Sequence, residues 1–562
     1  MAHRLNRLTR RQFTVMALGT ATAALLSEAC GPAAQPAPTP SGAGAPAPTA
    51  PPKAAAPTVP PPAAAAPTAA KVAVTATAPA VTKPSGGSLV YARNMDTKTL
   101  DPHFSTQLSE RYALYLIYNT LVAYDNDFNI GPDLAASWDI GDGGKSITFH
   151  LQPGVKFHDG TDCDAAAVKW NLERILDPSV KSPLLGQLQP PLEKVDVVDK
   201  TTVKLQTSIP WRPLLAGLGE RPGFIVSPTA AQKSGQDFGR TPVGSGPFKF
   251  VEWVPDSHIT VERFADYWDK GKPRLDRIDI RHVPDTQVQL GMIRTGEAHL
   301  IDSVAASALS TLQGAQGVTT EELKSGRFWG TQSHSDIPPF DNVDLRKAVA
   351  YVTDREAVRR VAFQETGRLA THPLGGGWAF NAQLDSEGYT LDLDKAKEAL
   401  ARSGYAGQPL TFTNSNDRLT QNIAQILQTT YTKAGLNVSL ESVPAADSFT
   451  RVKEGKTNWT TTNWAPRADP DGLLRILWHS TGFQNTTKFS DPEVDRLLDQ
   501  AAGLFDNKQA AAIYTEVERK VVQEASYAFM IWPSEFAARR TNVQGFVYYP
   551  DLILRLRDLS LA

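Results

Sequence analysis

The chain has 562 residues, with 57 basic and 59 acidic side chains and two cysteines. Seven of the basic residues and one of the acidic residues precede residue 88, which leaves the rest with 50 basic and 58 acidic residues and a net charge near −8. An acidic body without basic runs argues against nucleic acid as a partner. The body of about 475 residues is long enough to bury a large core, and it implies more than one domain.

Residues 1–30 predict an export signal. Arg10 and Arg11 precede a short apolar run over 15–26. Basic residues before a short apolar run are typical of a secretory signal, and the paired arginines are typical of the twin-arginine route, which exports folded proteins. The run is too short to span a bilayer stably. Cys30 predicts a lipoprotein cleavage site with a lipid-bearing N-terminus, although the two residues at 27 and 28 depart from the usual lipoprotein pattern.

Residues 31–87 predict a disordered tether. They contain no aromatic and no acidic residue and consist mainly of alanine and proline. Such a segment cannot bury enough apolar area to offset its ordering entropy, so it stays semi-extended. If Cys30 carries lipid, Cys163 has no partner for an internal disulfide, and the body relies on its core.

The body alternates predicted helices and strands. In its first half the patterns predict a helix within 106–122, a hairpin of strands 136–140 and 146–151, and a helix that begins at Asp162 or Asp164 and ends at Leu176. In its second half they predict a helix capped by Asp344, a helix over 394–403 that ends at Gly404, and a helix that begins at Asp491 and Pro492. No repeat of fixed period is present.

Residues 459–472 read W-T-T-T-N-W-A-P-R-A-D-P-D-G. The β-branched and aromatic first half predicts a strand, and the prolines, aspartates and glycine predict a turn before an apolar run that can open a helix. Trp464 and Arg467 therefore lie where a strand gives way to a loop, a place suited to a small-molecule pocket. Taken alone, the segment favours a core tryptophan and a solvated surface arginine.

Six stretches of the body carry a family resemblance. They are L-I-Y-N-T-L-V-A-Y-D (116–125), P-D-L-A-A-S-W (132–138), F-H-L-Q-P-G-V-K-F-H-D-G-T (149–161), P-V-G-S-G-P-F-K-F-V-E-W (242–253), D-N-V-D-L-R-K-A-V-A-Y-V-T-D-R (341–355) and N-W-A-P-R-A-D-P-D-G (463–472). In this order they resemble family 5 of the bacterial extracellular solute-binding proteins. That family contains the dipeptide-, oligopeptide-, glutathione- and nickel-binding proteins of ABC importers.

The resemblance implies an α/β, two-lobed periplasmic-binding-protein fold of type II, of the large peptide-binding class. It implies two crossing segments between the lobes, expected at 327–331 and 530–533, and an added subdomain in lobe one. The expected divisions are lobe one over 88–328 with its subdomain at about 120–240, lobe two over 329–530, and a C-terminal return to lobe one over 531–562.

The resemblance also implies where a ligand binds. In the peptide-binding members, an aspartate shortly after the tryptophan of the last stretch pairs with the peptide's α-amino group, and the equivalent place here holds Arg467. A guanidinium suits a carboxylate, and the arginine form resembles glutathione-binding relatives. The alternative is that Arg467 pairs with Asp469 or Asp471. The predicted ligand contacts are Trp464, Arg467, His103, Phe104, Trp329, Arg240 and Asp469.

Some of these residues have a second interpretation. His103 also fits a capping or surface histidine, and Trp329 also fits hinge packing. Cys163 fits a small core residue better than a nucleophile. Gly244-Ser245-Gly246 lacks the spacing of a nucleophile elbow, and the ten histidines lack metal-ligand spacing. No catalytic residue, cofactor or metal ligand is predicted.

The predicted function is that of an extracytoplasmic receptor of an ABC importer. It would capture a short peptide or a glutathione-like carboxylate solute by hinged lobe closure and deliver it to a membrane permease. The chain is expected to be a monomer that is not an enzyme, periplasmic or at the cell surface, and anchored by lipid. The alternatives are a hydrolase, or a protein that binds haem or a nickel chelate, on the same scaffold.

Overall fold

A computed structural model describes residues 86–188, 191–549 and 551–562. The predicted twin-arginine signal, Cys30 and residues 31–85 of the predicted tether lie outside the described residues. Within these described ranges, no helix combines the length and the apolar character needed to cross a membrane.

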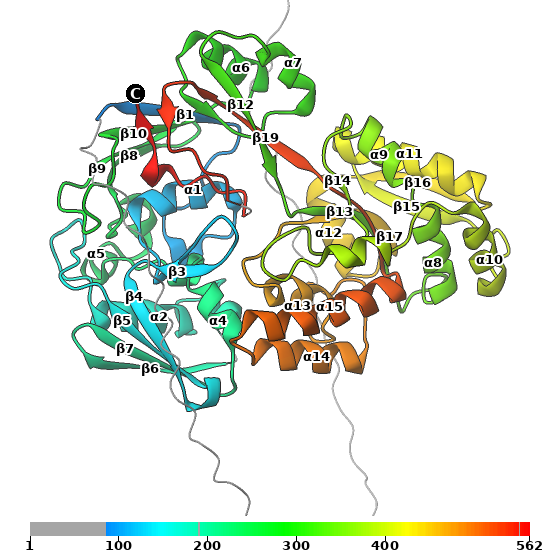
Figure 1. The fold of residues 1–562 in the computed structure, drawn as a ribbon, viewed down its shortest axis with the longest axis horizontal. Helices are drawn as coiled ribbons and strands as arrows, with labels where there is room; N and C mark the ends of the chain where they lie inside the picture. The colour runs from blue at the N-terminus through cyan, green and yellow to red at the C-terminus, as the bar shows by residue number, and fades with distance from the viewer. Residues whose placement is uncertain (1–85, 189–190, 550) are drawn as a thin grey trace, which may run out of the picture. The chain divides into compact units, whose positions relative to one another are not determined.

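A seven-stranded sheet forms the centre of lobe one, in the order β12-β19-β11-β1-β10-β9-β8 (Figure 1). Its strands are β1 (Ser88–Arg93), β8 (Phe248–Val254), β9 (His258–Arg263), β10 (Arg277–His282), β11 (Leu300–Ile301), β12 (Val318–Lys324) and β19 (Ser534–Arg540). Strand β1 pairs in parallel with β10 and β11, whereas β19 pairs antiparallel with β11 and β12. The C-terminal part of the chain therefore returns to the sheet of lobe one.

A separate four-stranded antiparallel sheet, in the order β4-β5-β7-β6, forms the added subdomain of lobe one. Its strands are β4 (Ala135–Gly141), β5 (Ser146–Leu151), β6 (Leu192–Asp199) and β7 (Thr202–Thr207). The predicted hairpin is confirmed, because β4 pairs with β5. Helix α2 (Ala165–Leu176) packs on β6 and β7, and the Asp164 carboxylate accepts hydrogen bonds from the first turn of that helix.

The other elements of lobe one are short. The helices are α1 (Leu108–Ile117), α3 (Leu185–Leu188), α4 (Arg212–Gly217), α5 (Pro228–Ser234), α6 (Thr286–Thr295) and α7 (Leu309–Leu312). Two strand pairs complete it: β2 (Val122–Tyr124) with β3 (Ile130–Pro132), and β20 (Val543–Gln544) with β21 (Ser560–Leu561). Cys163 is buried in the core of the subdomain, as the sequence predicted.

A six-stranded sheet, in the order β14-β18-β13-β17-β15-β16, forms lobe two. Its strands are β13 (Phe328–Ser333), β14 (Arg368–Leu369), β15 (Leu410–Ser415), β16 (Val438–Val443), β17 (Trp459–Trp464) and β18 (Tyr527–Trp532). The predicted strand over 459–464 is confirmed. It pairs antiparallel with β13, which places Trp464 opposite Phe328.

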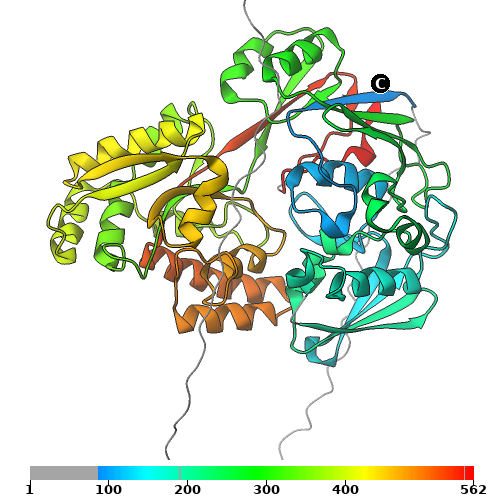
Figure 2. The ribbon, with the colours of Figure 1, turned by 180° about the vertical axis from the view of Figure 1, so that it is seen from behind.

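The helices of lobe two are α8 (Val343–Val352), α9 (Arg355–Val361), α10 (Leu393–Ser403), α11 (Arg418–Lys433), α12 (Ala445–Lys453), α13 (Asp471–Trp478), α14 (Pro492–Ala502) and α15 (Asn507–Glu524). Helices α13, α14 and α15 pack against one another (Figures 1 and 2). Gly404 ends α10 with a left-handed φ of 70°, and Asp491 caps α14, both as predicted. The predicted Asp344 cap of α8 is wrong, because the Asn342 side chain accepts the hydrogen bonds from the first turn.

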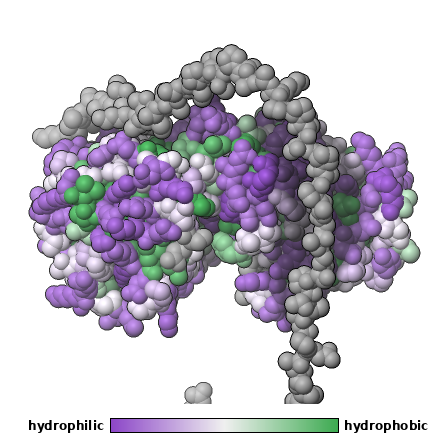
Figure 3. Space-filling model, turned by 90° about the horizontal axis from the view of Figure 1, so that it is seen from below, coloured by the Kyte–Doolittle hydropathy of each residue, from purple (hydrophilic) through white to green (hydrophobic). Residues whose placement is uncertain are grey.

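The chain passes twice between the two large sheets. The first passage lies between β12 and β13, at residues 325–327, and the second lies at Pro533, between β18 and β19. Strand β18 is buried along its whole length, so the second passage starts inside the core of lobe two. The face of the molecule in Figure 3 is mainly hydrophilic, with hydrophobic residues in small separate groups.

Candidate ligand site

Arg467 lines a small cavity beyond the end of β17. The other walls are residues 374–379, Gly326, Pro466, Ala468, Pro470 and Leu473. The cavity volume is about 10 Å³, which is room for about one water molecule. Within the described residues the Arg467 guanidinium makes no direct hydrogen bond or ion pair, although its charge acts on the Glu220 carboxylate. A guanidinium that makes no direct ion pair at a cavity wall is suited to an anionic group of a ligand.

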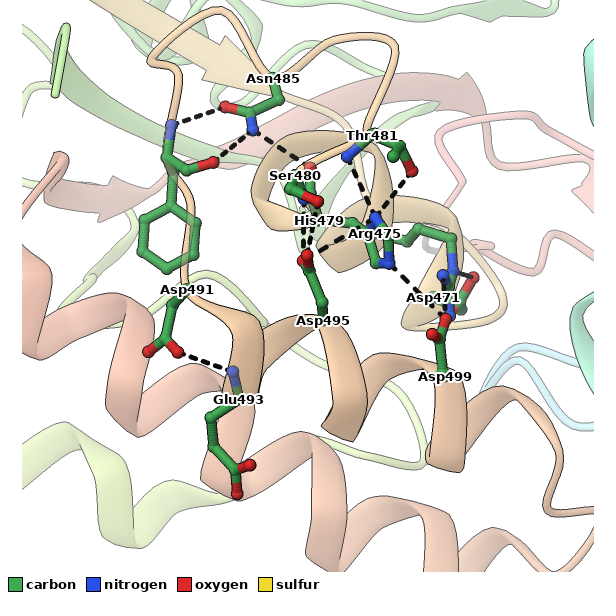
Figure 4. A network of polar contacts seen from close by, with 11 residues as sticks. Asp471, Arg475, His479, Ser480, Thr481, Asn485, Asp491, Glu493, Asp495 and Asp499 are labelled. Atoms are coloured by element: carbon green, nitrogen blue, oxygen red, sulfur yellow. Dashed lines mark hydrogen bonds and ion pairs between the residues drawn. The ribbon is translucent and has the colours of Figure 1, made fainter. Parts of the chain in front are cut away.

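Both aspartates that might have paired with Arg467 have other partners. The Asp471 carboxylate accepts from Arg475 at 2.9 Å, and Arg475 also reaches Asp499 at 2.7 Å (Figure 4). The Asp469 carboxylate pairs with Arg212 at 2.8 Å. The alternative in which Arg467 is neutralised by a neighbouring aspartate is therefore not what the structure shows.

The pair of Arg212 and Asp469 joins the two lobes. Arg212 opens helix α4 in lobe one, and Asp469 precedes α13 in lobe two. Each side chain is 4% exposed. The Arg212 guanidinium also donates to the Tyr514 hydroxyl at 3.0 Å and lies 4.4 Å from the centre of the Trp378 ring. Burial raises the pKa of Asp469, and the charge of Arg212 opposes that effect.

Glu220 lies among arginines on the side of lobe one. Its carboxylate is 3.6 Å from the Arg111 guanidinium and 12% exposed. Burial acts to raise the pKa of Glu220, but nearby cations lower it to about 2. These cations are Arg111, Arg467, Arg221 and Arg555. Arg467 of lobe two therefore lies within electrostatic reach of a carboxylate of lobe one.

Tyr124 packs near both Arg467 and Glu220. The Tyr124 ring packs with Ala468, the residue after Arg467. The same ring lies so close to Gly219, the residue before Glu220, that a Cβ there would be 2.5 Å from it. Asp551 pairs with Arg111 at 2.9 Å, which compensates part of the charge of the arginine cluster within lobe one.

A glycine-rich loop forms the opposite wall of the cavity. A Cβ on Gly375 would lie 2.5 Å from the Trp532 indole, so only glycine fits there. The Glu518 carboxylate accepts from the backbone N–H of Leu374 at 3.1 Å and from His372 at 2.7 Å. This buried carboxylate therefore fixes the start of the loop.

Neither predicted tryptophan lines the cavity. Trp464 is half-buried at the end of β17, packs against the core of lobe two and shares a hydrogen bond with Tyr527. Trp329 contacts Phe363 edge-on, with ring centres 5.9 Å apart. Trp329 and its neighbour Phe328 pack into different cores, because successive residues of a strand point to opposite faces.

His103 is fully buried in lobe one, and both ring nitrogens have partners. Nε2 lies 3.2 Å from the Phe224 carbonyl and Nδ1 lies 3.0 Å from the Arg174 guanidinium. Since a carbonyl only accepts and a guanidinium only donates, Nε2 carries the proton. Burial lowers the pKa of His103 to about 4. This environment favours a structural role.

The remaining predicted contacts lie outside the cavity lining. Phe104 is 39% exposed, with the Arg174 guanidinium 5.6 Å from its ring centre. Arg240 is exposed and lies 3.9 Å from the centre of the Trp253 ring. Of the seven predicted contacts, only Arg467 lines the cavity, and Asp469 lies in the adjoining contact between the lobes.

Sequence reasoning missed Arg212, Glu220 and the loop of glycines. The three consecutive glycines before Trp378 were a visible signal, because such a run commonly marks a close approach of the backbone to another group. Arg212 and Glu220 carried no signal, since their partners lie far away along the chain.

One group of possible metal ligands lies in lobe one. The ligand atoms of Asp96, Asp256 and His282 are within 4.8 Å of one another, and Asp256 is exposed. Asp96 follows strand β1, and His282 ends the adjacent parallel strand β10. None of the three lines the cavity beside Arg467.

Comparisons with known proteins agree with the fold. The family model described as "Bacterial extracellular solute-binding proteins, family 5 Middle" matches residues 129–485. The chain is 28% identical over 505 residues to the glutathione-binding protein GsiB of Pectobacterium atrosepticum, covering 87% of this chain and 98% of the relative.

Two solved structures have the same fold. The periplasmic binding protein DppA of Helicobacter pylori, in complex with the peptide STSA, has a TM-score of 0.74 and 25% identity, covering 85% of this chain and 98% of its own. The binding protein AgaA of A. tumefaciens R10, in complex with agropinic acid, has a TM-score of 0.73 and 27% identity. The match covers 85% of this chain and 99% of AgaA.

Proposed function

Because the chain belongs to family 5 of the bacterial extracellular solute-binding proteins, we propose that it is the substrate-binding receptor of an ABC importer. In this role it captures a solute outside the cytoplasm and passes it to a membrane permease without altering it. The match of the chain to relatives over almost their whole length supports this proposal.

The solute we propose is a short peptide or a glutathione-like compound with at least one carboxylate. The observation that carries this is the Arg467 residue at the cavity wall, where it makes no direct ion pair with a described residue. The positive surroundings of Glu220 also favour an anion. One relative is named a glutathione-binding protein, and one similar structure holds agropinic acid. A charge-assisted hydrogen bond to a carboxylate contributes about 1.5–3 kcal/mol.

The mechanism we propose is hinged closure about the two passages between the sheets. A cavity of about 10 Å³ is too small for a peptide, so a solute can enter only when its walls separate. The ion pair of Arg212 and Asp469 belongs to the closed arrangement, because its partners come from different lobes. Closure follows solute binding only if the solute binds the closed form more tightly than the open one.

In the cell, we propose that the protein is a monomer exported by the twin-arginine route. A lipid on Cys30 and the tether over 31–87 would hold the body near the permease. The ATP-hydrolysing subunits are other chains. The roles of Trp464, Phe104 and the other predicted contacts stay predictions of the sequence.

The test is native mass spectrometry of the purified protein, followed by calorimetry with glutathione, dipeptides and tripeptides. We expect a co-purified small molecule and 1:1 binding of at least one of these solutes. Recovery of the solute chemically changed after incubation favours the hydrolase alternative. A coloured or metal-containing preparation that binds none of these solutes favours the alternative of a haem- or nickel-binding protein.

A further inference from the structure

We infer that Arg467 and the backbone N–H groups of Gly375, Gly376 and Gly377 form a subsite for one carboxylate of the solute. The inference rests on the proposed function and adds which groups hold the anion. Arg467 and all three glycines line the same cavity, which brings a cationic side chain and a run of backbone donors to one place.

The three glycine N–H groups are unsatisfied within the described chain. None of them donates a hydrogen bond to another described residue, whereas the preceding N–H, that of Leu374, donates to Glu518. Gly375 is buried, and buried N–H groups without an acceptor are rare in native proteins. Gly376 and Gly377 are exposed and can donate to water, so it is the buried N–H of Gly375 that calls for an acceptor outside the described chain.

The backbone conformation of the glycine loop is suited to binding an anion. Gly377 has a left-handed φ of 86°, and successive N–H groups around a left-handed residue form a concave, positively polarised surface. Around Gly376 a Cβ would meet no atom within 4 Å, so space remains open on that side. Arg467 adds a positive charge at the same cavity, and this charge also acts on the Glu220 carboxylate.

Size and position limit the occupant to one small group. The cavity has room for about one water molecule, so one carboxylate end can enter only after the walls move apart, with the rest of the solute outside it. Phe128 of lobe one would lie 3.4 Å from a Cβ on Gly377, so closure brings an apolar ring against this loop. An anion bound there is partly shielded from water, which strengthens its charge-assisted hydrogen bonds.

The experiment labels the protein with ¹⁵N-glycine and records amide spectra during titration with glutathione, sodium acetate, acetamide and inorganic phosphate. Single Gly→Ala variants assign the three resonances. We expect glutathione and acetate to move the amide signals of Gly375, Gly376 and Gly377, and acetamide to leave them in place. Phosphate should move them only at higher concentration than acetate; the reverse order overturns the assignment to a carboxylate.

The matched variants are Arg467→Ala and Arg496→Ala. Arg496 is an exposed arginine of α14, paired with Glu493, and does not line the cavity. We expect Arg467→Ala to abolish the acetate-induced shifts and weaken glutathione binding by about tenfold or more, equal to about 1.4 kcal/mol. Arg496→Ala should change neither.

The outcomes separate this subsite from the proposed function. If glutathione or a peptide binds by calorimetry while the three glycine signals stay fixed, the subsite is wrong and the receptor function stands. If none of these solutes binds but acetate moves the three signals, the subsite stands and the proposed solute class is wrong. If acetate fails to move them at any concentration, the subsite is wrong.

Discussion

The Arg212 guanidinium and the Asp469 carboxylate form a two-point ion pair between the lobes, with Nη1 2.8 Å from Oδ2 and Nη2 3.2 Å from Oδ1. Planar guanidinium and carboxylate groups that meet in this way form strong and directional hydrogen bonds. Both side chains are 4% exposed, so under the proposed hinged closure the pair would form fully only with the lobes together. We therefore expect it to set how stable the closed form is.

Replacing Arg212 by methionine tests this expectation. Removing one partner of a buried ion pair destabilises a protein by about 3–5 kcal/mol. Here only the closed form would lose this stability. We expect a larger radius of gyration by small-angle X-ray scattering and solute binding weaker by at least about tenfold. The control is Arg496→Met, since Arg496 is exposed and pairs with Glu493 on α14. Equal scattering curves for both variants and the parent would count against the role of this pair.

Changing Arg467 tests carboxylate recognition. The Arg467→Lys variant keeps the charge but loses the two-pronged fork, so we expect affinity for glutathione between those of the parent and Arg467→Ala. For the corresponding solute with its carboxylates converted to amides, all three proteins should bind alike. Calorimetry measures both series. An affinity of Arg467→Ala equal to that of the parent would remove Arg467 from the site.

Glu220 would compete with the proposed carboxylate solute for the charge of Arg467. Arg467 and three arginines of lobe one lower the pKa of Glu220 to about 2, so it is fully ionised at neutral pH. Replacing it by glutamine removes one negative charge next to Arg467, and we expect roughly tenfold tighter binding of a carboxylate solute. The control is Glu516→Gln on an exposed face of α15. Weaker binding in Glu220→Gln would show that Glu220 contacts a positive group of the solute instead.

Alanine substitutions at Gly375 and Gly376 give a matched comparison of protein stability. A Cβ on Gly375 would lie 2.5 Å from the buried Trp532 indole, whereas a Cβ on Gly376 would meet nothing within 4 Å. We expect Gly375→Ala to lower the free energy of unfolding by about 1–3 kcal/mol, as overpacked cores do. Gly376→Ala should change it by less than about 0.5 kcal/mol, as is usual for open sites. Urea denaturation compares the two, and equal values would contradict the packing.

His103 makes the stability of lobe one depend on pH. Its pKa is lowered to about 4 by burial, and Arg174 adds to this effect although Asp101 opposes it. Between the ordinary histidine pKa near 6.5 and pH 4 the unfolded chain binds more protons, so stability falls as the pH falls through this window. The full loss attributable to His103 is about 3 kcal/mol.

The His103→Gln variant should therefore show a shallower fall in melting temperature between pH 6.5 and 4, because glutamine keeps a donor and an acceptor but does not titrate. A residual slope will remain, since burial also lowers the pKa of His158 to about 4. His150→Gln, at a side chain that is 45% exposed, serves as the control. Parallel melting curves for His103→Gln and the parent would contradict the assignment.

Local patterns determined the elements of the fold. The strand over 459–464, the hairpin of β4 and β5, and the caps at Asp164, Gly404 and Asp491 follow from propensities and turn chemistry that act over a few residues. The family strings added the two lobes and the return of the chain. The Asp344 cap failed because Asn342, two residues earlier, has the same capping chemistry.

Tertiary structure alone decided the site. The sequence placed a cation at Arg467, but whether a neighbouring aspartate neutralises it depends on Arg212, which is 257 residues from Asp469 along the chain. The same holds for Glu220, whose proton affinity is set by arginines from both lobes. Histidine is a residue type that often binds ligands, but His103 is buried like a core residue. Its burial depends on the whole fold and cannot be read from the residue type. Charge interactions and hydrogen bonds depend on distances in space. The residue types therefore indicated candidate site residues, and only the packing of the folded chain showed which of them lie together.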